Sequence, residues 1–327
     1  MAAFNAHSFT GLMVCLHSRL GGSAGENSRL GNASGGLIGY SYTSVVLVVS
    51  DTAAIVMIAF RVVALTSLCL LATVFTPLQA AQRVISLAPS LTEMMLDLQA
   101  EHRLVGILEG GERPQAVAQV PSVGQFGQFE LETMLTLQPD LILHWPSSIS
   151  AMQLQQLDHL GVPIFTSQPQ TMDQLAEQFA ELGALVGAQQ RGAELTAQLQ
   201  QQLAQMRARY QRDSPLRVFY QVWDAPMYTL GGEQIISDAL RICGAENIYA
   251  DLKLPAPQVS IESVIARNPE VILLGSSRLA QMWQAWPTLR AVALGQVLEV
   301  PDHGLERPSL QMFAALEQLC EHLADFE

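Results

Sequence analysis

Leu131-Glu132-Thr133-Met134-Leu135, followed by Pro139-Asp140-Leu141-Ile142-Leu143, has a counterpart 130 positions later in the chain. The counterpart is Ile261-Glu262-Ser263-Val264-Ile265, followed by Pro269-Glu270-Val271-Ile272-Leu273-Leu274. In both copies a glutamate precedes a proline–acid pair by seven positions, and the pair opens an apolar run.

The repeat predicts a short helix with the glutamate in its first turn, where the helix dipole favours negative charge. A tight turn at the proline then leads into a buried parallel strand. Two such units predict two similar lobes, each presenting one acidic side chain. The alternative is a chance similarity between two common helix–turn–strand units.

Residues 57–80 have the order of a secretory signal peptide. Met57 and Arg61 give a short basic start, Val62–Val74 is apolar, and Ala80 is a small residue suited to cleavage before residue 81. The apolar run is shorter than the ~20 residues of a membrane span, which favours a signal peptide; a signal anchor is the alternative. Residues 1–56 are rich in Gly and Ser without sustained periodicity, and we expect translation to begin at Met57.

The charge of the chain argues against a nucleic-acid partner. The chain has 17 basic and 30 acidic residues, a formal net charge of −13, and its only lysine is Lys253. Binding to phosphate backbones needs clustered Lys and Arg. We therefore expect no DNA or RNA function.

Cys243 and Cys320 are the two cysteines beyond the predicted signal peptide. Compartments outside the inner membrane are oxidising, so an exported chain with two cysteines favours a disulfide. The bridge would close a loop of 77 residues. Two separately buried thiols are the alternative.

Alternating elements follow the predicted cleavage site. Short apolar runs at 83–87, 104–108, 140–144 and 163–166 read as strands, with helical segments between them. Ser90-Leu91-Thr92-Glu93 has the pattern of a capped helix start. Strands that alternate with helices predict a parallel α/β sheet.

A long helix is predicted between the lobes. Leu195, Leu199, Leu203 and Met206 recur at helical spacing within residues 190–211, which gives a helix of roughly 30 Å. The fold class is therefore α/β, with two parallel-sheet lobes joined by one long backbone helix. The expected order is an N-terminal lobe (81–188), the linking helix (189–213) and a C-terminal lobe (214–327). A single long helix between the lobes predicts a stiff clamshell whose lobes close only to a limited extent. The alternative is a surface helix on one larger domain.

These residues resemble the helical-backbone (class III) substrate-binding proteins of ABC importers, and within that family the periplasmic cobalamin-binding branch. The resemblance covers about residues 82–326. It is carried by Arg83 to Glu93, by Leu131 to Trp145, by Cys243-Gly244-Ala245-Glu246-Asn247-Ile248, by Pro257 to Glu262, and by Glu306-Arg307-Pro308-Ser309 with Gln318-Leu319-Cys320. The cysteine contexts and Pro257-Gln258-Val259-Ser260 point to the cobalamin branch.

The resemblance implies a periplasmic monomer that hands its ligand to a membrane permease with its ATPase. In the family a glutamate on each lobe pairs with permease arginines, and these positions correspond to Glu132 and Glu262. Acids on the lobe surfaces gain charge-assisted hydrogen bonds when a basic partner arrives. Stabilisation of a helix N-terminus alone is the alternative reading of both residues.

The resemblance also implies a corrinoid ligand held between the lobes by aromatic side chains, with no metal site or resident cofactor. The ligand-binding candidates are Phe126, Trp145, Trp223, Tyr228 and Arg307. Phe126 stands where the family has a cleft tryptophan, and Arg307 matches its second-lobe arginine. For Trp145 and Trp223 the alternative is packing at strand ends.

Other ligands and classes are weighed on the same residues. Catecholate siderophores would need several cleft arginines, and haem would need an axial Tyr or His, for which His144, Tyr228 and His303 are available. A hydrolase needs a nucleophile with a base and an orienting group, and the sequence has no such grouping, so we expect no enzyme. A periplasmic receptor that signals without transport is a further alternative.

Overall fold

The computed structural model describes residues 80–326, except 112, 126, 147 and 160. All of them fall in the second of the two units into which the chain divides. The predicted extension (1–56), the predicted signal peptide (57–80) apart from Ala80, and Phe126 lie outside the described residues. No helix of the described part has the length and apolarity that crossing a membrane requires.

Within the described residues, a six-stranded sheet of order β4-β3-β2-β1-β5-β6 forms the first lobe, which we take as residues 80–188. The strands are β1 (Val84–Ser86), β2 (Leu104–Glu109), β3 (Ser122–Gln125), β4 (Gln128–Phe129), β5 (Leu141–His144) and β6 (Ile164–Thr166). The predicted parallel pairing is confirmed for β2, β1, β5 and β6. The edge strand β4 pairs antiparallel with β3, through a turn in which Gly127 takes a positive φ of 85°.

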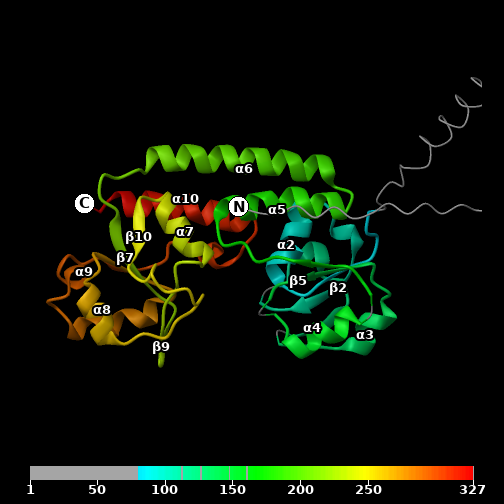
Figure 1. Cartoon of the computed structure of the whole chain (residues 1–327), viewed down its shortest axis with the longest axis horizontal. Helices are drawn as coiled ribbons and strands as arrows, with labels where there is room; N and C mark the ends of the chain where they lie inside the picture. The colour runs from blue at the N-terminus through cyan, green and yellow to red at the C-terminus, as the bar shows by residue number, and fades with distance from the viewer. Residues whose placement is uncertain (1–79, 112, 126, 147, 160, 327) are drawn as a thin grey trace, which may run out of the picture. The chain divides into compact units, whose positions relative to one another are not determined.

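The second lobe contains a four-stranded sheet of order β10-β7-β11-β12 in which every pairing is parallel. Its strands are β7 (Leu216–Gln221), β10 (Ala245–Asn247), β11 (Val271–Leu274) and β12 (Val297–Glu299). A separate antiparallel hairpin, β8 (Trp223–Asp224) with β9 (Met227–Tyr228), projects from this lobe (Figure 1).

Helices cover both sheets. In the first lobe they are α2 (Pro89–Asp97), α3 (Leu131–Thr136), α4 (Ala151–Asp158) and α5 (Met172–Leu185). In the second lobe they are α7 (Ile235–Ile242), α8 (Ile261–Arg267), α9 (Arg290–Ala293) and α10 (Leu310–Ala324). Short 3-10 turns η1 (Glu101–Arg103), η2 (Gln115–Val117), η3 (Ser277–Ala285) and η4 (His303–Glu306) complete the order.

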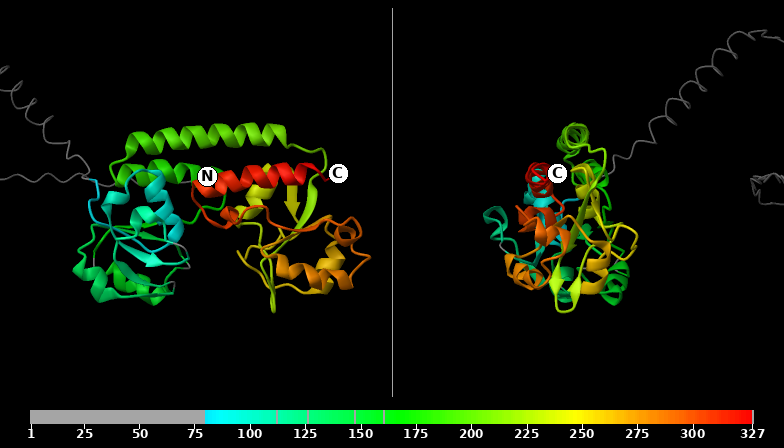
Figure 2. Two further views of the ribbon diagram at one scale, coloured as in Figure 1. Left: turned by 180° about the vertical axis from the view of Figure 1, so that it is seen from behind. Right: turned by 90° about the vertical axis from the view of Figure 1, so that its left-hand side faces the viewer.

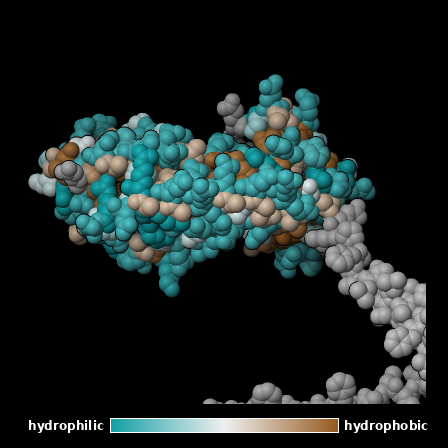
Figure 3. All heavy atoms as spheres, turned by 90° about the horizontal axis from the view of Figure 1, so that it is seen from above, coloured by the Kyte–Doolittle hydropathy of each residue, from teal (hydrophilic) through white to brown (hydrophobic). Residues whose placement is uncertain are grey.

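The predicted backbone helix is α6 (Gln189–Arg209), which runs above α5 and α10 (Figures 1 and 2). Leu195, Leu199, Leu203 and Met206 are buried, as their spacing predicts. Its outer face is mostly hydrophilic (Figure 3). A Cβ at Gly192 would collide with the Phe179 carbonyl group, so glycine allows α6 to approach α5 closely.

One hydrophobic cluster continues through both lobes on the side of α6. It includes Leu91 and Phe179 of the first lobe together with Leu240 and Leu316 of the second. Two further clusters fill the faces of the individual sheets. Because the lobes share a close-packed core, their relative motion would disturb buried contacts, and this gives a physical reason to expect the predicted stiffness.

The repeated sequence unit folds in the same way in both lobes. Helices α3 and α8 each carry their glutamate in the first turn, and each is followed by a left-handed residue, Gln138 (φ 46°) and Asn268 (φ 42°). In each unit the chain then enters a fully buried strand, β5 in the first lobe and β11 in the second. The sequence prediction of two similar helix–turn–strand units is confirmed.

The acid of each proline–acid pair ties the unit to the first strand of its lobe. Asp140 accepts hydrogen bonds from the amides of Gln82 and Arg83, and Glu270 accepts one from the amide of Arg217, at 2.8 Å. The guanidinium of Arg83 donates to the Leu137 carbonyl, and that of Arg217 donates to the Arg267 carbonyl. In both lobes an arginine therefore satisfies a carbonyl at the end of the short helix.

Cys243 and Cys320 form a disulfide, as predicted, with a Cα–Cα distance of 4.6 Å. The bridge joins the end of α7 to α10, and both residues are buried.

The predicted cap at Ser90-Leu91-Thr92-Glu93 is wrong. Helix α2 begins at Pro89, its N-cap is Ala88, and no side chain caps it. Pro89 fits the first helical position because its missing N–H would have no partner there. Glu93 consequently does not turn back to its own helix and instead contacts the second lobe.

Candidate ligand-binding cleft

A cavity of about 390 Å³ opens between the lobes. From the first lobe it is lined by Ala88, Pro89, Ser90, Gly110, Trp145 and Ser148, and from the second by residues 234–236 and 305–308. A second cavity of about 300 Å³ continues from it, because both are lined by Trp145, Gln234 and Ile235. Each volume lies in the range of small-molecule sites.

The two cavities differ in chemistry. The larger one has apolar walls with Glu306 and Arg307 on one side. The smaller one carries polar side chains from both lobes, including Gln168 and Gln170 of the first and Glu233 and Lys253 of the second. The site therefore offers apolar surface for a ring and hydrogen-bonding groups for polar substituents.

Among the predicted ligand residues that the structure describes, Trp145 and Arg307 line the larger cavity. Trp145 is half-buried directly after β5, so one part of the indole packs on the core and the rest borders the cavity. This placement follows the rule that parallel α/β lobes bind ligands beyond the carboxyl ends of their strands.

Trp223 and Tyr228 face each other across the β8–β9 hairpin and do not line either cavity. Trp223 is 47% exposed, and the Arg278 guanidinium lies 4.2 Å from its ring centroid. A cation–π contact of this kind holds an indole in place at the surface. The hairpin thus presents an ordered aromatic face.

The structure adds residues that the sequence did not single out. Gln234, Ile235 and Ile236 line the larger cavity from the start of α7, and Glu93 of α2 binds Arg307 at 2.8 Å. Helix starts are recognisable in a sequence. Their convergence on one cavity is a tertiary feature that spacing does not reveal.

Asp97, one turn after Glu93 on α2, accepts a hydrogen bond from the Leu310 amide at 3.1 Å. Burial raises its pKa to about 6, and the nearby Glu93 adds to this, while the Leu310 bond and Arg191 oppose it. A folded-state pKa above the ordinary value of 3.8 means that folding favours the protonated carboxyl. The associated stability is complete below pH ~3.8 and is lost as the pH rises through about 6.

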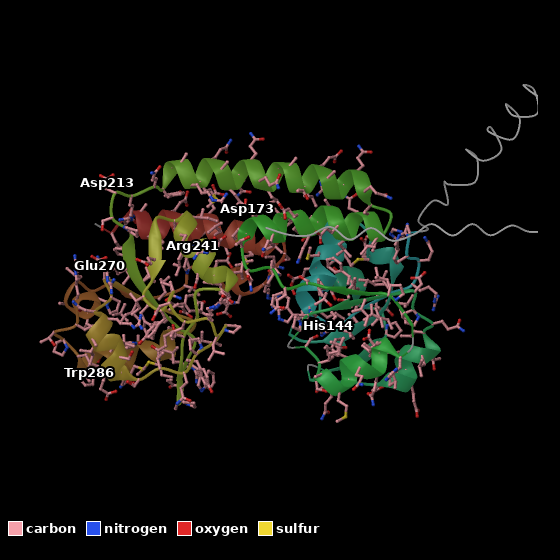
Figure 4. The ribbon with its side chains drawn as sticks, viewed as in Figure 1. His144, Asp173, Asp213, Arg241, Glu270 and Trp286 are labelled. Atoms are coloured by element: carbon pink, nitrogen blue, oxygen red, sulfur yellow. A yellow bond between two sulfur atoms is a disulfide. The ribbon has the colours of Figure 1, made fainter. Side chains whose placement is uncertain are left out.

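Asp97→Asn is therefore expected to stabilise the protein at pH 7.5 by about 1.5 kcal/mol. This is less than the free-energy equivalent of the whole pKa shift, because the carboxyl group is partly solvated. Asparagine keeps an acceptor for the Leu310 amide but carries no charge to desolvate. The gain should shrink towards zero as the pH falls from 6 to 4. Urea unfolding of the wild type and the variant at pH 7.5 and at pH 4 measures the gain. Asp213→Asn, at an exposed site, is the control (Figure 4). A gain that is equal at all pH values would contradict the assignment.

The three residues considered as haem ligands differ in accessibility. His144 is 2% exposed within β5, and burial lowers its pKa (Figure 4). His303 is exposed, with its Nε2 atom 3.5 Å from Glu299, and Tyr228 lies on the hairpin. Among the described residues, no group of three or more His, Cys, Asp or Glu side chains is arranged to hold a metal ion.

Glu132 and Glu262 are exposed on α3 and α8, on the sides of the lobes away from α6 (Figures 1 and 2). The pKa of Glu262 is lowered by hydrogen bonds from its own backbone amide and from the Ser260 hydroxyl. Glu262 is therefore ionised and accessible at neutral pH. Both side chains are free of the cavity linings.

Residues 84–303 match the model of the periplasmic binding protein family. The chain therefore belongs to this family of substrate-binding proteins.

Among its relatives, a vitamin B12-binding protein of Vibrio cholerae is 33% identical over 270 residues, covering 82% of this chain and 98% of that protein. A vitamin B12-binding protein of Vibrio vulnificus is 32% identical over 266 residues, covering 80% and 97%. The crystal structure of the periplasmic vitamin B12-binding protein BtuF of Vibrio cholerae superimposes with a TM-score of 0.68 at 34% identity, covering 75% of this chain and 97% of that one. The periplasmic heme-binding protein HutB of the same organism shares the fold, with a TM-score of 0.63 at 21% identity.

Proposed function

We propose that this protein binds a corrinoid, cobalamin or a close relative, in the cleft between its lobes and delivers it to an ABC importer. The observation that carries the proposal is the interlobe cavity, in which Trp145 borders apolar walls and Arg307 stands at the rim. A flat ring with amide-bearing edges needs this combination of apolar and hydrogen-bonding surface. Identity of about one third to vitamin B12-binding proteins over nearly their whole length supports it.

The protein would act in the periplasm as a monomer, with a permease and its ATPase as partners. Glu132 and Glu262 are the proposed docking residues because both are exposed acids on corresponding helices. Further ligand contacts are proposed for Trp223 and Tyr228, on the β8–β9 hairpin of the second lobe, and for Phe126 of the first lobe. Lobes 81–188 and 214–327, joined by 189–213, are the proposed domains.

Haem and ferric siderophores fit the described side chains less well. Haem would need an axial ligand in the cleft, whereas the His144 ring is buried in β5 and neither His303 nor Tyr228 lines the two cavities. An anionic siderophore would need several cleft arginines, whereas Arg307 is the one arginine among the described residues that line the larger cavity, and the smaller cavity is lined by none of the described arginines. Both compounds belong in the binding test as competing ligands.

The absorption spectrum of the exported protein and titration calorimetry with cyanocobalamin, cobinamide, haem and a ferric siderophore test the proposal. We expect at least one corrinoid to bind and the other two compounds to fail. Binding of haem or the siderophore with neither corrinoid would leave the fold assignment intact and overturn the ligand. A protein that binds the ligand normally in cells that do not import it would be a sensor and not part of a transporter.

Trp145→Ala should weaken corrinoid binding about tenfold, since a stacked aromatic contributes ~0.5–1.5 kcal/mol beyond area burial. Trp286→Ala is the matched control, because Trp286 is a half-buried tryptophan of the second lobe outside both cavity linings (Figure 4). Calorimetry measures both affinities, and far-ultraviolet circular dichroism checks the fold. Equal affinity for wild type and Trp145→Ala would remove Trp145 from the site.

A further inference from the structure

Two helix N-termini meet beneath the middle of α6. Helix α5 of the first lobe begins at Met172, helix α10 of the second begins at Leu310, and the two run outward from there (Figures 1 and 2). The first amides of a helix have no partner within it, and the helix dipole makes that end positive. Two such ends close together need hydrogen-bond acceptors for their free amides.

Each lobe supplies a carboxylate to the helix of the other. Asp238 on α7 accepts a hydrogen bond from the Met172 amide at 2.8 Å, and Asp97 on α2 accepts one from the Leu310 amide at 3.1 Å. Both acids therefore satisfy an amide at the start of a helix that belongs to the opposite lobe. The seam between the lobes is polar at its centre and surrounded by the shared apolar core.

Glu93 is the third acid at this seam, and both of its oxygens bind the second lobe. One oxygen accepts from Arg307 Nη1 at 2.8 Å and the other from the Ser309 hydroxyl at 2.9 Å. Glu93 is 6% exposed and Ser309 is fully buried. A buried carboxylate is tolerated when it is paired and hydrogen-bonded in this way.

Arg307 extends from the seam to the cleft. Its side chain is 42% exposed and lines the larger cavity, while Nη1 is held by Glu93. The backbone at Gly111 of the first lobe comes close enough that a Cβ there would lie 3.6 Å from Nη2. The neighbouring Glu306 is engaged elsewhere, because it accepts a hydrogen bond from the Tyr220 hydroxyl at 3.0 Å.

We propose that Glu93 is a positioning residue that reaches from the first lobe and fixes the Arg307 guanidinium at the cleft wall, where it recognises an amide or phosphate oxygen at the edge of the ligand. A guanidinium has five N–H donors in a rigid plane, so anchoring one nitrogen orients the others. The ligand then contacts an arginine that the second lobe carries and the first lobe orients. This inference rests on the proposed corrinoid function.

A double-mutant cycle tests whether Glu93 acts through Arg307. Glu93→Gln, which keeps the size of the side chain and removes its charge, should lower the affinity for cyanocobalamin about tenfold in titration calorimetry, and Arg307→Gln should lower it by a similar factor. The double variant should bind no more weakly than Arg307→Gln, because one interaction cannot be lost twice. Glu177→Gln, at an exposed acid of α5, is the control.

Two results would overturn the positioning role. One is a Glu93→Gln variant that binds as wild type does; the other is a double variant in which the two losses multiply, since a purely structural Glu93 would act independently of Arg307. Glu93→Asp, which keeps the charge and shortens the reach, provides a second variant if Glu93→Gln does not fold.

A measurement without ligand separates this inference from the proposed function. The nitrogen-15 side-chain signals of Arg307, assigned by their loss in Arg307→Gln, should show an ordered guanidinium in the wild type and an averaged one in Glu93→Gln. If the wild type binds no corrinoid, the proposed function fails, and these signals still decide the role of Glu93. Identical signals in both proteins would overturn it.

Discussion

Replacing both Glu132 and Glu262 by arginine is expected to reduce ligand uptake more than about 100-fold, while ligand affinity stays unchanged. The two glutamates stand in the first turns of corresponding helices, one on each lobe, and are exposed away from the cavities. Pairing with permease arginines would give each a charge-assisted hydrogen bond, and reversal replaces it by repulsion. A single replacement should reduce uptake about tenfold, or ~1.4 kcal/mol of docking.

Uptake of labelled cyanocobalamin, in cells that lack their own binding protein and carry the cognate permease, measures the effect. A double variant with the same change in charge, Glu181→Arg with Glu317→Arg, is the control, because these acids are exposed on α5 and α10. The control should transport normally. A parallel loss of ligand affinity in the Glu132 and Glu262 variants would place these residues in the cleft or the fold and contradict the docking role.

The repeated unit shows how far local sequence leads. The repeated pattern predicts a short helix, a tight turn and a buried strand, and all three recur in α3–β5 and α8–β11, where the structure adds a left-handed residue before each proline. The sequence did not reveal that Arg83 and Arg217 each satisfy a carbonyl at the end of the unit. These arginines lie 54 and 50 positions before their acceptors, beyond the reach of any periodic pattern.

Glu93 illustrates the same limit at the site. Its place three residues after Ser90 fits a capping box, but the helix starts at Pro89 and the carboxylate binds Arg307 and Ser309, more than 200 positions away. The local interpretation failed because a long-range charged partner competes better than a cap that proline makes unnecessary. Trp145 and Arg307, which do line the larger cavity, were predicted from the positions that the family resemblance assigns to ligand contacts.

The binding site and the rigid frame share one element, the seam between α5 and α10. Asp97 and Asp238 accept hydrogen bonds from the helix ends that the fold brings together, and Glu93 extends the same seam to the cleft through Arg307. Changes that loosen the seam should therefore affect binding even when they lie outside the cavity. Changes deep in the second lobe, away from the seam, should affect stability alone.

Removing the Cys243–Cys320 disulfide tests the second of these expectations. The bridge closes a loop of 77 residues that holds most of the second lobe, so its loss should lower the free energy of unfolding by about 4 kcal/mol on the chain-entropy estimate. For a protein of this size the melting temperature should fall by roughly 10 °C. Neither cysteine lines a cavity of the cleft, so ligand affinity should stay within about twofold of wild type.

Thermal unfolding of the wild type with and without a reductant measures the loss with every side chain unchanged in size. Cys243→Ala with Cys320→Ala should be destabilised at least as much, because it also leaves small cavities in a buried site. Reductant should have no effect on that double variant, which isolates the bridge from other actions of the thiol. If the bridge mainly constrains the unfolded chain, the reduced protein should still bind its ligand below its lower melting temperature. Loss of binding in the folded, reduced protein would show that the bridge shapes the cleft, and the separation of the second-lobe core from the site would be wrong.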